Sequence, residues 1–123
     1  MALRVLVVDD NVTFLDAARV LLERQGVTIV GVATTTDEAR RQADGLRPDV
    51  VLVDIAVGRE SGFELARRLA EDDPNGGSTV ILTSTHEEAD FADLIGAGPA
   101  AGFVPKSELS ATEIERIRGA RSS

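Results

Sequence analysis

Short apolar runs and helical stripes alternate five times along the chain. The apolar runs predict strands at 3–8, 27–33, 50–53, 79–83 and 101–105. The first run is apolar at almost every position, which is typical of a strand buried on both faces of a sheet. Apolar residues at helical spacing follow each run, and the clearest stripe comprises Phe14, Leu15, Ala18, Leu21 and Leu22.

Capping signals indicate where the later helices begin and end. A serine or threonine with a glutamate three residues later marks a helix start at Thr35, Ser61, Thr85 and Ser110, paired with Glu38, Glu64, Glu88 and Glu113. Residues 72–78 are rich in Asp, Gly and Pro and predict a loop. The alternation predicts an α/β fold, a doubly wound five-stranded parallel sheet with five helices. We expect one domain over 1–119 and a disordered end at 120–123.

Polar side chains lie at the ends of four of the predicted strands. Asp9 and Asp10 follow the first strand, Asp54 follows the third, Thr83 is the last residue of the fourth, and Lys106, the only lysine in the chain, follows the fifth. The carboxyl ends of neighbouring parallel strands meet along one edge of such a sheet. We therefore expect these residues to lie close together.

A cluster of three aspartates needs cations to balance it. Two like charges about 5 Å apart repel by roughly 3 kcal/mol at an effective dielectric constant near 20. Mg²⁺ suits such a site because it binds a few carboxylates, retains waters and binds phosphate oxygens. With a cation and Lys106 beside it, one carboxylate can act as a nucleophile toward a phosphoryl group and form an aspartyl phosphate.

Composition excludes several classes of function. The chain has 123 residues, 13 cationic and 21 acidic side chains and a net charge of −8, which argues against direct binding to nucleic acid. It contains no apolar stretch near the length of about 20 residues that spans a bilayer, so we expect no membrane segment. The absence of cysteine excludes disulfides and thiol chemistry and agrees with a cytoplasmic location.

The ordered set of strand-end residues resembles the response regulator receiver domains of two-component signalling, in particular single-domain regulators like those of chemotaxis. The resemblance covers essentially the whole chain and rests on Asp9, Asp10, Asp54, Gly62, Thr83, Phe103 and Lys106. It implies a flavodoxin-like sheet of order 2-1-3-4-5.

The resemblance also implies a role for each acidic residue. Asp54 corresponds to the phosphoacceptor, and Asp10 to a direct ligand of Mg²⁺. Asp9 corresponds to a residue nearer the water shell of the metal. The backbone carbonyl of Ala56 corresponds to a third ligand from the protein.

Three further residues correspond to the switching machinery of this family. Lys106 is expected to contact the phosphoryl group, and Thr83 to hydrogen-bond to it. Phe103 matches an aromatic switch position whose ring moves inward and alters the surface made by the fourth helix, fifth strand and fifth helix. Implied partners are a sensor histidine kinase or histidine phosphotransfer protein, and an output protein or domain. Dimerisation on phosphorylation is compatible with this scheme, and no enzymatic activity beyond the chain's own phosphorylation and dephosphorylation is expected.

The chain departs from the common pattern of the family at two positions. Gly58 stands where proline is frequent, which predicts a looser loop beside Asp54. Ser107 stands where proline usually follows the lysine, so we expect a trans peptide bond at 106–107. Phenylalanine at position 103 has no hydroxyl, so its switching can only be steric.

Two alternatives remain open from the residues alone. Residues 9–13 approach the DxDxT signature of small phosphohydrolases with an aspartate nucleophile, but the third position is Asn11. A receiver-like interaction module that is not phosphorylated is the other alternative. His86, the only histidine, is expected to be a solvated surface residue, so the phosphodonor histidine would belong to another protein.

Overall fold

Five parallel strands form the central sheet of this computed structural model, which describes residues 2–85 and 92–122. The strands are β1 (Arg4–Val8), β2 (Thr28–Ala33), β3 (Val50–Asp54), β6 (Thr79–Ser84) and β7 (Gly102–Pro105). Their order is β2-β1-β3-β6-β7. Numbered along the chain, the five strands follow the order 2-1-3-4-5, which confirms the predicted flavodoxin-like sheet.

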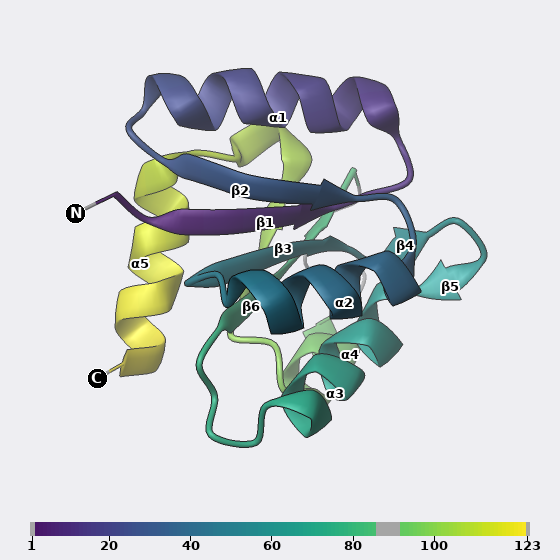
Figure 1. Ribbon diagram of the computed structural model, residues 1–123. Helices are drawn as coiled ribbons and strands as arrows, with labels where there is room; N and C mark the ends of the chain where they lie inside the picture. The colour runs from purple at the N-terminus through teal and green to yellow at the C-terminus, as the bar shows by residue number, and fades with distance from the viewer. Residues whose placement is uncertain (1, 86–91, 123) are drawn as a thin grey trace.

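Helices cover both faces of the sheet (Figure 1). The helices are α1 (Val12–Arg24), α2 (Thr36–Leu46), α3 (Gly62–Asp72), α4 (Ala92–Ala97) and α5 (Ala111–Ser122), and a 3-10 turn, η2, spans Lys106–Glu108. The helices α1 and α5 pack on one face, where residues such as Leu22 and Ile114 join the core. The helices α2 and α3 pack on the other, where Leu65 and Leu69 do so. Two apolar layers therefore enclose the sheet.

Side-chain caps form where the sequence predicts them, within the described residues. The Thr35 hydroxyl accepts a hydrogen bond from the Glu38 amide, and the Ser61 hydroxyl accepts one from the Glu64 amide. Ser110 caps α5 in the same way through the Glu113 amide at 3.1 Å. These bonds satisfy amides that have no partner inside the helix. The cap predicted for Thr85 depends on Glu88, which lies outside the described residues, as does His86.

Three local predictions differ from the structure. Residues 56–61 form a hairpin of two short strands, β4 (Ala56–Val57) and β5 (Glu60–Ser61), rather than a plain loop. The helix α5 continues past Gly119 to Ser122. Leu21, predicted to belong to the buried stripe of α1, is 39% exposed because it lies at the edge of the stripe formed by Leu15, Ala18 and Leu22.

Gly58 explains the hairpin. It has a φ angle of +64° at the turn between β4 and β5, a left-handed conformation that proline cannot adopt. The expectation of a looser loop at Gly58 is therefore replaced by a defined turn that lies at the same end of the sheet as Asp54. The described residues contain no cis peptide bond, so the bond between Lys106 and Ser107 is trans, as predicted.

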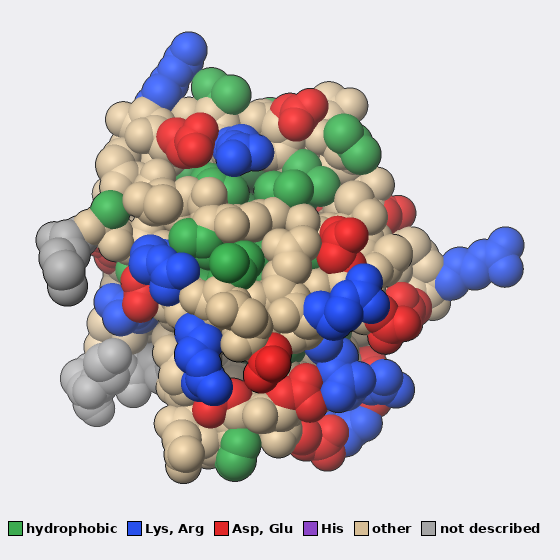
Figure 2. Space-filling view, viewed as in Figure 1, with side chains coloured by type: hydrophobic (Ala, Val, Ile, Leu, Met, Phe, Trp, Pro, Cys, Tyr) green, Lys and Arg blue, Asp and Glu red, His purple; other side chains and the backbone are tan. Residues whose placement is uncertain are grey.

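Charged side chains of both signs mix on the surface over α2 and α3 (Figure 2). Arg40 on α2 makes two hydrogen bonds of 2.8 Å to Asp72 on α3, and Arg67 pairs with Glu64 and Glu71. Such exposed pairs are solvated surface features. Across the described ranges, no helix is both long and apolar enough to cross a membrane.

Candidate functional site

Three carboxylates meet at the carboxyl ends of β1 and β3. These two strands are parallel neighbours, so Asp9 and Asp10, which follow β1, lie beside Asp54, the last residue of β3. Each of the three offers one oxygen, and these oxygens lie within 4.8 Å of one another. The structure thus brings together the acids that the sequence places at separate strand ends.

Asp9 is fully buried, whereas Asp10 is exposed. The Asp9 Oδ1 atom accepts a hydrogen bond of 2.9 Å from the Asn11 amide. The buried Oδ2 atom accepts no hydrogen bond of good geometry, and it forms an ion pair with the Lys106 ammonium at 2.5 Å. A buried carboxylate oxygen with so little hydrogen bonding is a fitting ligand for a cation.

Asp54 is held by contacts on both of its oxygens. Its Oδ1 atom accepts a hydrogen bond of 3.3 Å from the Ala56 amide, and its Oδ2 atom lies 3.3 Å from Lys106 Nζ. Gly62 packs against the backbone here, because a Cβ atom at this position would lie 1.9 Å from the Asp54 carbonyl oxygen. The hairpin formed by β4 and β5 begins two residues after Asp54 and leads into this glycine.

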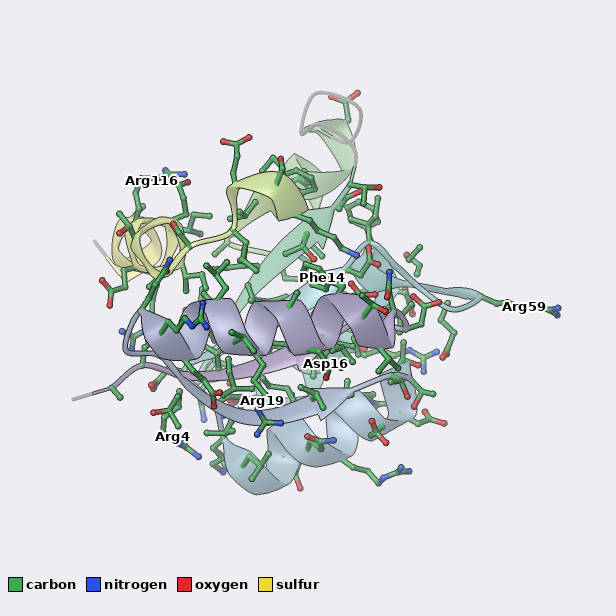
Figure 3. The ribbon with its side chains drawn as sticks, turned by 90° about the horizontal axis from the view of Figure 1, so that it is seen from above. Arg4, Phe14, Asp16, Arg19, Arg59 and Arg116 are labelled. Carbon is green, nitrogen blue, oxygen red and sulfur yellow. The ribbon has the colours of Figure 1, made fainter. Side chains whose placement is uncertain are left out.

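Lys106 lies where its ammonium contacts both buried Asp9 and partly buried Asp54. It is the first residue of η2, and its side chain is 13% exposed. Besides the carboxylates of Asp9 and Asp54, the ammonium lies over the ring of Phe14, 4.2 Å from the ring centre. Figure 3 shows Phe14 on the side of α1 that faces the segment before α5, away from Asp16 and Arg19.

The pKa values of the site follow from this crowding. Burial is the largest influence on Asp54 and raises its pKa, the negative charge of Asp9 raises it further, and Lys106 and the Ala56 amide oppose both. For Lys106, burial lowers the pKa, but the hydrogen bonding and charge of Asp9 and Asp54 together raise it above its ordinary value. The lysine therefore stays charged, and the Asp54 carboxylate is less stable than one in water.

Thr83 is buried in the strand next to Asp54, and the two residues are paired in register. The Thr83 carbonyl accepts a hydrogen bond of 3.0 Å from the Ile55 amide, which ties the segment after Asp54 to β6. Because side chains alternate along parallel strands, Thr83 and Asp54 lie toward the same face of the sheet. This places the Thr83 hydroxyl on the side of the acidic cluster.

Phe103 lies on the other face of the sheet. It is paired with Leu82 and belongs to the core layer beneath α2 and α3. The ring is buried in the core, since Phe103 is 5% exposed. The structure thus shows the ring in a buried position, and the switch role of Phe103 stays a prediction.

Two residues that contribute to the site are not predicted from the sequence. Phe14, which the helical stripe predicts to be an ordinary core residue, also covers the Lys106 ammonium. Glu60 accepts a hydrogen bond of 2.6 Å from the hydroxyl of buried Thr36, which fastens the hairpin after Asp54 to α2. The contact between Phe14 and Lys106 joins segments far apart in the sequence, so no local spacing signals it. Glu60 carries no such signal.

Comparison with known proteins gives consistent matches. The family model of the response regulator receiver domain matches residues 5–118. Response regulator GacA of Pseudomonas viridiflava is 32% identical over 117 residues, which cover 94% of this chain and 54% of that protein. Protein-glutamate methylesterase/protein-glutamine glutaminase 6 of Anaeromyxobacter dehalogenans is 35% identical over 107 residues, covering 86% of this chain and 30% of that protein. The chain spans about half the length of the GacA proteins it matches.

Solved structures agree with these matches. A two-component response regulator of the LuxR family from Aurantimonas sp. SI85-9A1 superposes with a TM-score of 0.86 at 27% identity, covering 98% of this chain and 87% of that chain. The response regulator domain of CheB from Thermotoga maritima superposes with a TM-score of 0.80 at 28% identity, covering 100% of this chain and 98% of that chain.

Proposed function

This chain belongs to the response regulator receiver domain family, and we propose that Asp54 accepts a phosphoryl group in the presence of Mg²⁺. Receiver domains of two-component response regulators act in phosphorylation-based signalling. The observation that supports Asp54 as the acceptor is its place among Asp9, Asp10 and Lys106 at one end of the sheet.

Asp54 acts as the nucleophile in this proposal. A carboxylate oxygen of Asp54 forms a bond to phosphorus while the bond from phosphorus to the donor nitrogen or oxygen breaks, and the donor leaves with the electron pair. The Lys106 ammonium, 3.3 Å from Asp54 Oδ2, is close enough to move onto a phosphoryl oxygen. The hydroxyl of Thr83 donates a hydrogen bond to another phosphoryl oxygen. Hydrolysis of the acyl phosphate restores the carboxylate.

The acidic cluster fits a divalent cation that prefers oxygen ligands. Asp9 and Asp10 would hold Mg²⁺ together with Asp54 and the Ala56 carbonyl, and no sulfur or histidine ligand competes among the described residues of the cluster. The weak hydrogen bonding of the buried Asp9 Oδ2 is the observation that favours this assignment. Bound Mg²⁺ supplies positive charge that stabilises the phosphoryl oxygens during transfer.

Receiver domains exchange phosphoryl groups with histidine kinases or phosphotransfer proteins and act on output proteins or domains. We propose that the donor histidine approaches over α1, because a groove beside Lys106 is lined there by Phe14, Ala17 and Leu21. The output surface in this proposal consists of α4, β7 and α5. The proposal includes no direct binding to nucleic acid. Dimerisation on phosphorylation and a cytoplasmic location stay predictions.

Intact mass after incubation with Mg²⁺ and a small acyl-phosphate donor tests the proposal. One phosphoryl adduct that requires Mg²⁺ and disappears in Asp54→Asn is the expected result. No adduct, at times short enough to catch rapid hydrolysis, would instead favour an interaction module that is not phosphorylated. Steady turnover of phosphate esters without an adduct would favour a phosphohydrolase, although Asn11 uses its side chain to cap α1. We propose no further enzymatic activity.

A further inference from the structure

The face of the Phe14 ring covers the Lys106 ammonium, whose nitrogen lies 4.2 Å from the ring centre. The ring presents its negative face to a cation, and such contacts are favourable where the cation is shielded from water. The Lys106 side chain is only 13% exposed, so this condition is met. Three groups therefore surround the ammonium: two carboxylates and one aromatic ring.

Phe14 is held in this place by the same acidic segment that builds the site. The Asn11 amide donates to Asp9 Oδ1 at 2.9 Å, and the Asn11 side chain accepts a hydrogen bond of 3.2 Å from the Phe14 amide. The next residue, Leu15, is buried in the core beneath α1. The position of the ring is thus coupled through Asn11 to the position of the buried acid.

The three contacts of Lys106 differ in what else they can bind. Asp9 and Asp54 also belong to the carboxylate cluster suited to a divalent cation, and a carboxylate shared with a cation attracts the ammonium less strongly. The Phe14 ring is not a ligand for such a cation and lies against the lysine. The contact between the ring and the Lys106 ammonium therefore remains when the carboxylates bind a divalent cation.

We propose that Phe14 is a positioning residue that holds the Lys106 ammonium beside Asp54 when a divalent cation occupies the acidic cluster. This inference rests on the proposed phosphorylation of Asp54. Loss of the ring leaves the flexible lysine stem free to move its charge toward solvent, so that it meets the incoming phosphoryl group less often. Phe14 does not touch the reacting atoms; it acts through Lys106.

Nuclear magnetic resonance tests the contact directly, because Lys106 is the only lysine in the chain. Labelling with isotopic lysine gives a single set of side-chain signals, and protons that lie over an aromatic ring are shifted upfield. We expect upfield-shifted Lys106 ε-methylene protons with and without Mg²⁺, retained in Phe14→Tyr and lost in Phe14→Leu and Phe14→Met. Unshifted protons in the wild-type chain with Mg²⁺ would overturn the proposal.

The rate of phosphorylation by a small acyl-phosphate donor at saturating Mg²⁺ tests the consequence. Phe14→Leu should lower the rate about 3- to 10-fold, Phe14→Tyr should stay within about twofold of the wild type, and the exposed-site control Val20→Ala should match it. A small donor has no protein surface to dock on α1, so the rate does not depend on the docking of a partner protein. Phe14→Met keeps an apolar side chain if Phe14→Leu folds poorly.

The outcomes separate this inference from the proposed function. Failure of the wild-type chain to take up a phosphoryl group would overturn the proposed function and the role of Phe14 in transfer. If Phe14→Leu and Phe14→Met are phosphorylated as fast as the wild type, the positioning role of Phe14 is overturned and the proposed function is not. An equal loss of rate in Phe14→Tyr and Phe14→Leu would also overturn it, because the ring face would then not matter.

Discussion

The Lys106 ammonium lies closer to Asp9, at 2.5 Å, than to Asp54, at 3.3 Å. The lysine is thus paired mainly with the most deeply buried acid of the site, which has few other partners. It balances the charge of the cluster without blocking Asp54. In the proposed transfer, the ammonium needs to shift by only a short distance to meet a phosphoryl group, because it already contacts Asp54, the proposed acceptor.

Removing this ammonium should destabilise the fold. In Lys106→Met the buried Asp9 and Asp54 carboxylates have no lysine partner, so we expect the free energy of unfolding at neutral pH to fall by about 3 kcal/mol. Saturating Mg²⁺ should restore part of the loss, because a cation that binds only the folded state stabilises it. Urea unfolding with Mg²⁺ and with a chelator measures both effects. An equal loss under the two conditions would contradict the balancing role of Lys106.

Removing the charge of Asp54 should have the opposite effect. Burial and the charge of Asp9 raise the pKa of Asp54 in the folded state above its unfolded value, so its ionisation opposes folding. The stability that protonation contributes is fully present below about pH 3.8 and is lost as the pH rises through the folded pKa. At neutral pH without metal, the free energy of unfolding of Asp54→Asn should therefore be higher than that of the wild type.

Urea titrations across pH 4–7 in a chelator measure this difference. The gap between Asp54→Asn and the wild type should widen as the pH rises through the folded pKa of Asp54. A gap that narrows with rising pH would show that Lys106 outweighs burial and that the pKa is lowered.

A methyl group at Gly62 should disrupt the backbone beside Asp54. Its Cβ atom would lie 1.9 Å from the Asp54 carbonyl oxygen, and a backbone atom cannot move away as a flexible side chain can. We expect Gly62→Ala to lower the free energy of unfolding by about 3 kcal/mol. The matched control is Gly45→Ala in α2, where no atom lies within 4 Å and the change should stabilise by about 0.5–1 kcal/mol. Equal effects in urea unfolding would refute the clash.

The hydrogen bond from Thr36 to Glu60 should limit the opening of the hairpin after Asp54. Thr36→Val keeps the shape of the side chain but removes the donor, at a cost of about 1 kcal/mol. We expect hydrogen exchange of the amides in β4 and β5 to become about fivefold faster, as that free energy corresponds to a rate factor of this size. Thr28→Val at the exposed start of β2 serves as the control, and equal exchange in both variants would rule out the fastening role.

The exposed cluster on α3 should keep Glu64 ionised in strong acid. Hydrogen bonds from Arg67, followed by those from Arg68, lower the pKa of Glu64 to about 2. Because the pKa of Glu64 is lower in the folded state, the ionised carboxylate stabilises the fold at pH values above its unfolded pKa of 4.5. This contribution is lost as the pH falls toward 2. A carboxyl chemical-shift titration should show this midpoint, and Arg67→Gln should move it upward. High salt should also raise it, since the pair is exposed to solvent.

Much of the fold follows from local patterns in the sequence. Runs such as 50–53 are apolar throughout, so they can only be buried on both faces, and the caps at Thr35, Ser61 and Ser110 depend on residues three apart. The convergence of Asp9 and Asp54 follows as well, because neighbouring parallel strands end at the same edge. The hairpin at 56–61 could not be predicted, since two-residue strands carry no periodicity.

The sequence by itself determined which side chains the strand ends carry: the acids at 9, 10 and 54, the threonine at 83 and the single lysine at 106. Only the tertiary structure decided that the ammonium pairs mainly with Asp9, that Phe14 covers it, and that Phe103 lies on the opposite face of the sheet. The physical reason is that the positions of the strands along the chain follow from local hydrophobic patterns, whereas the orientation of a long side chain depends on charges and rings that distant segments bring to it.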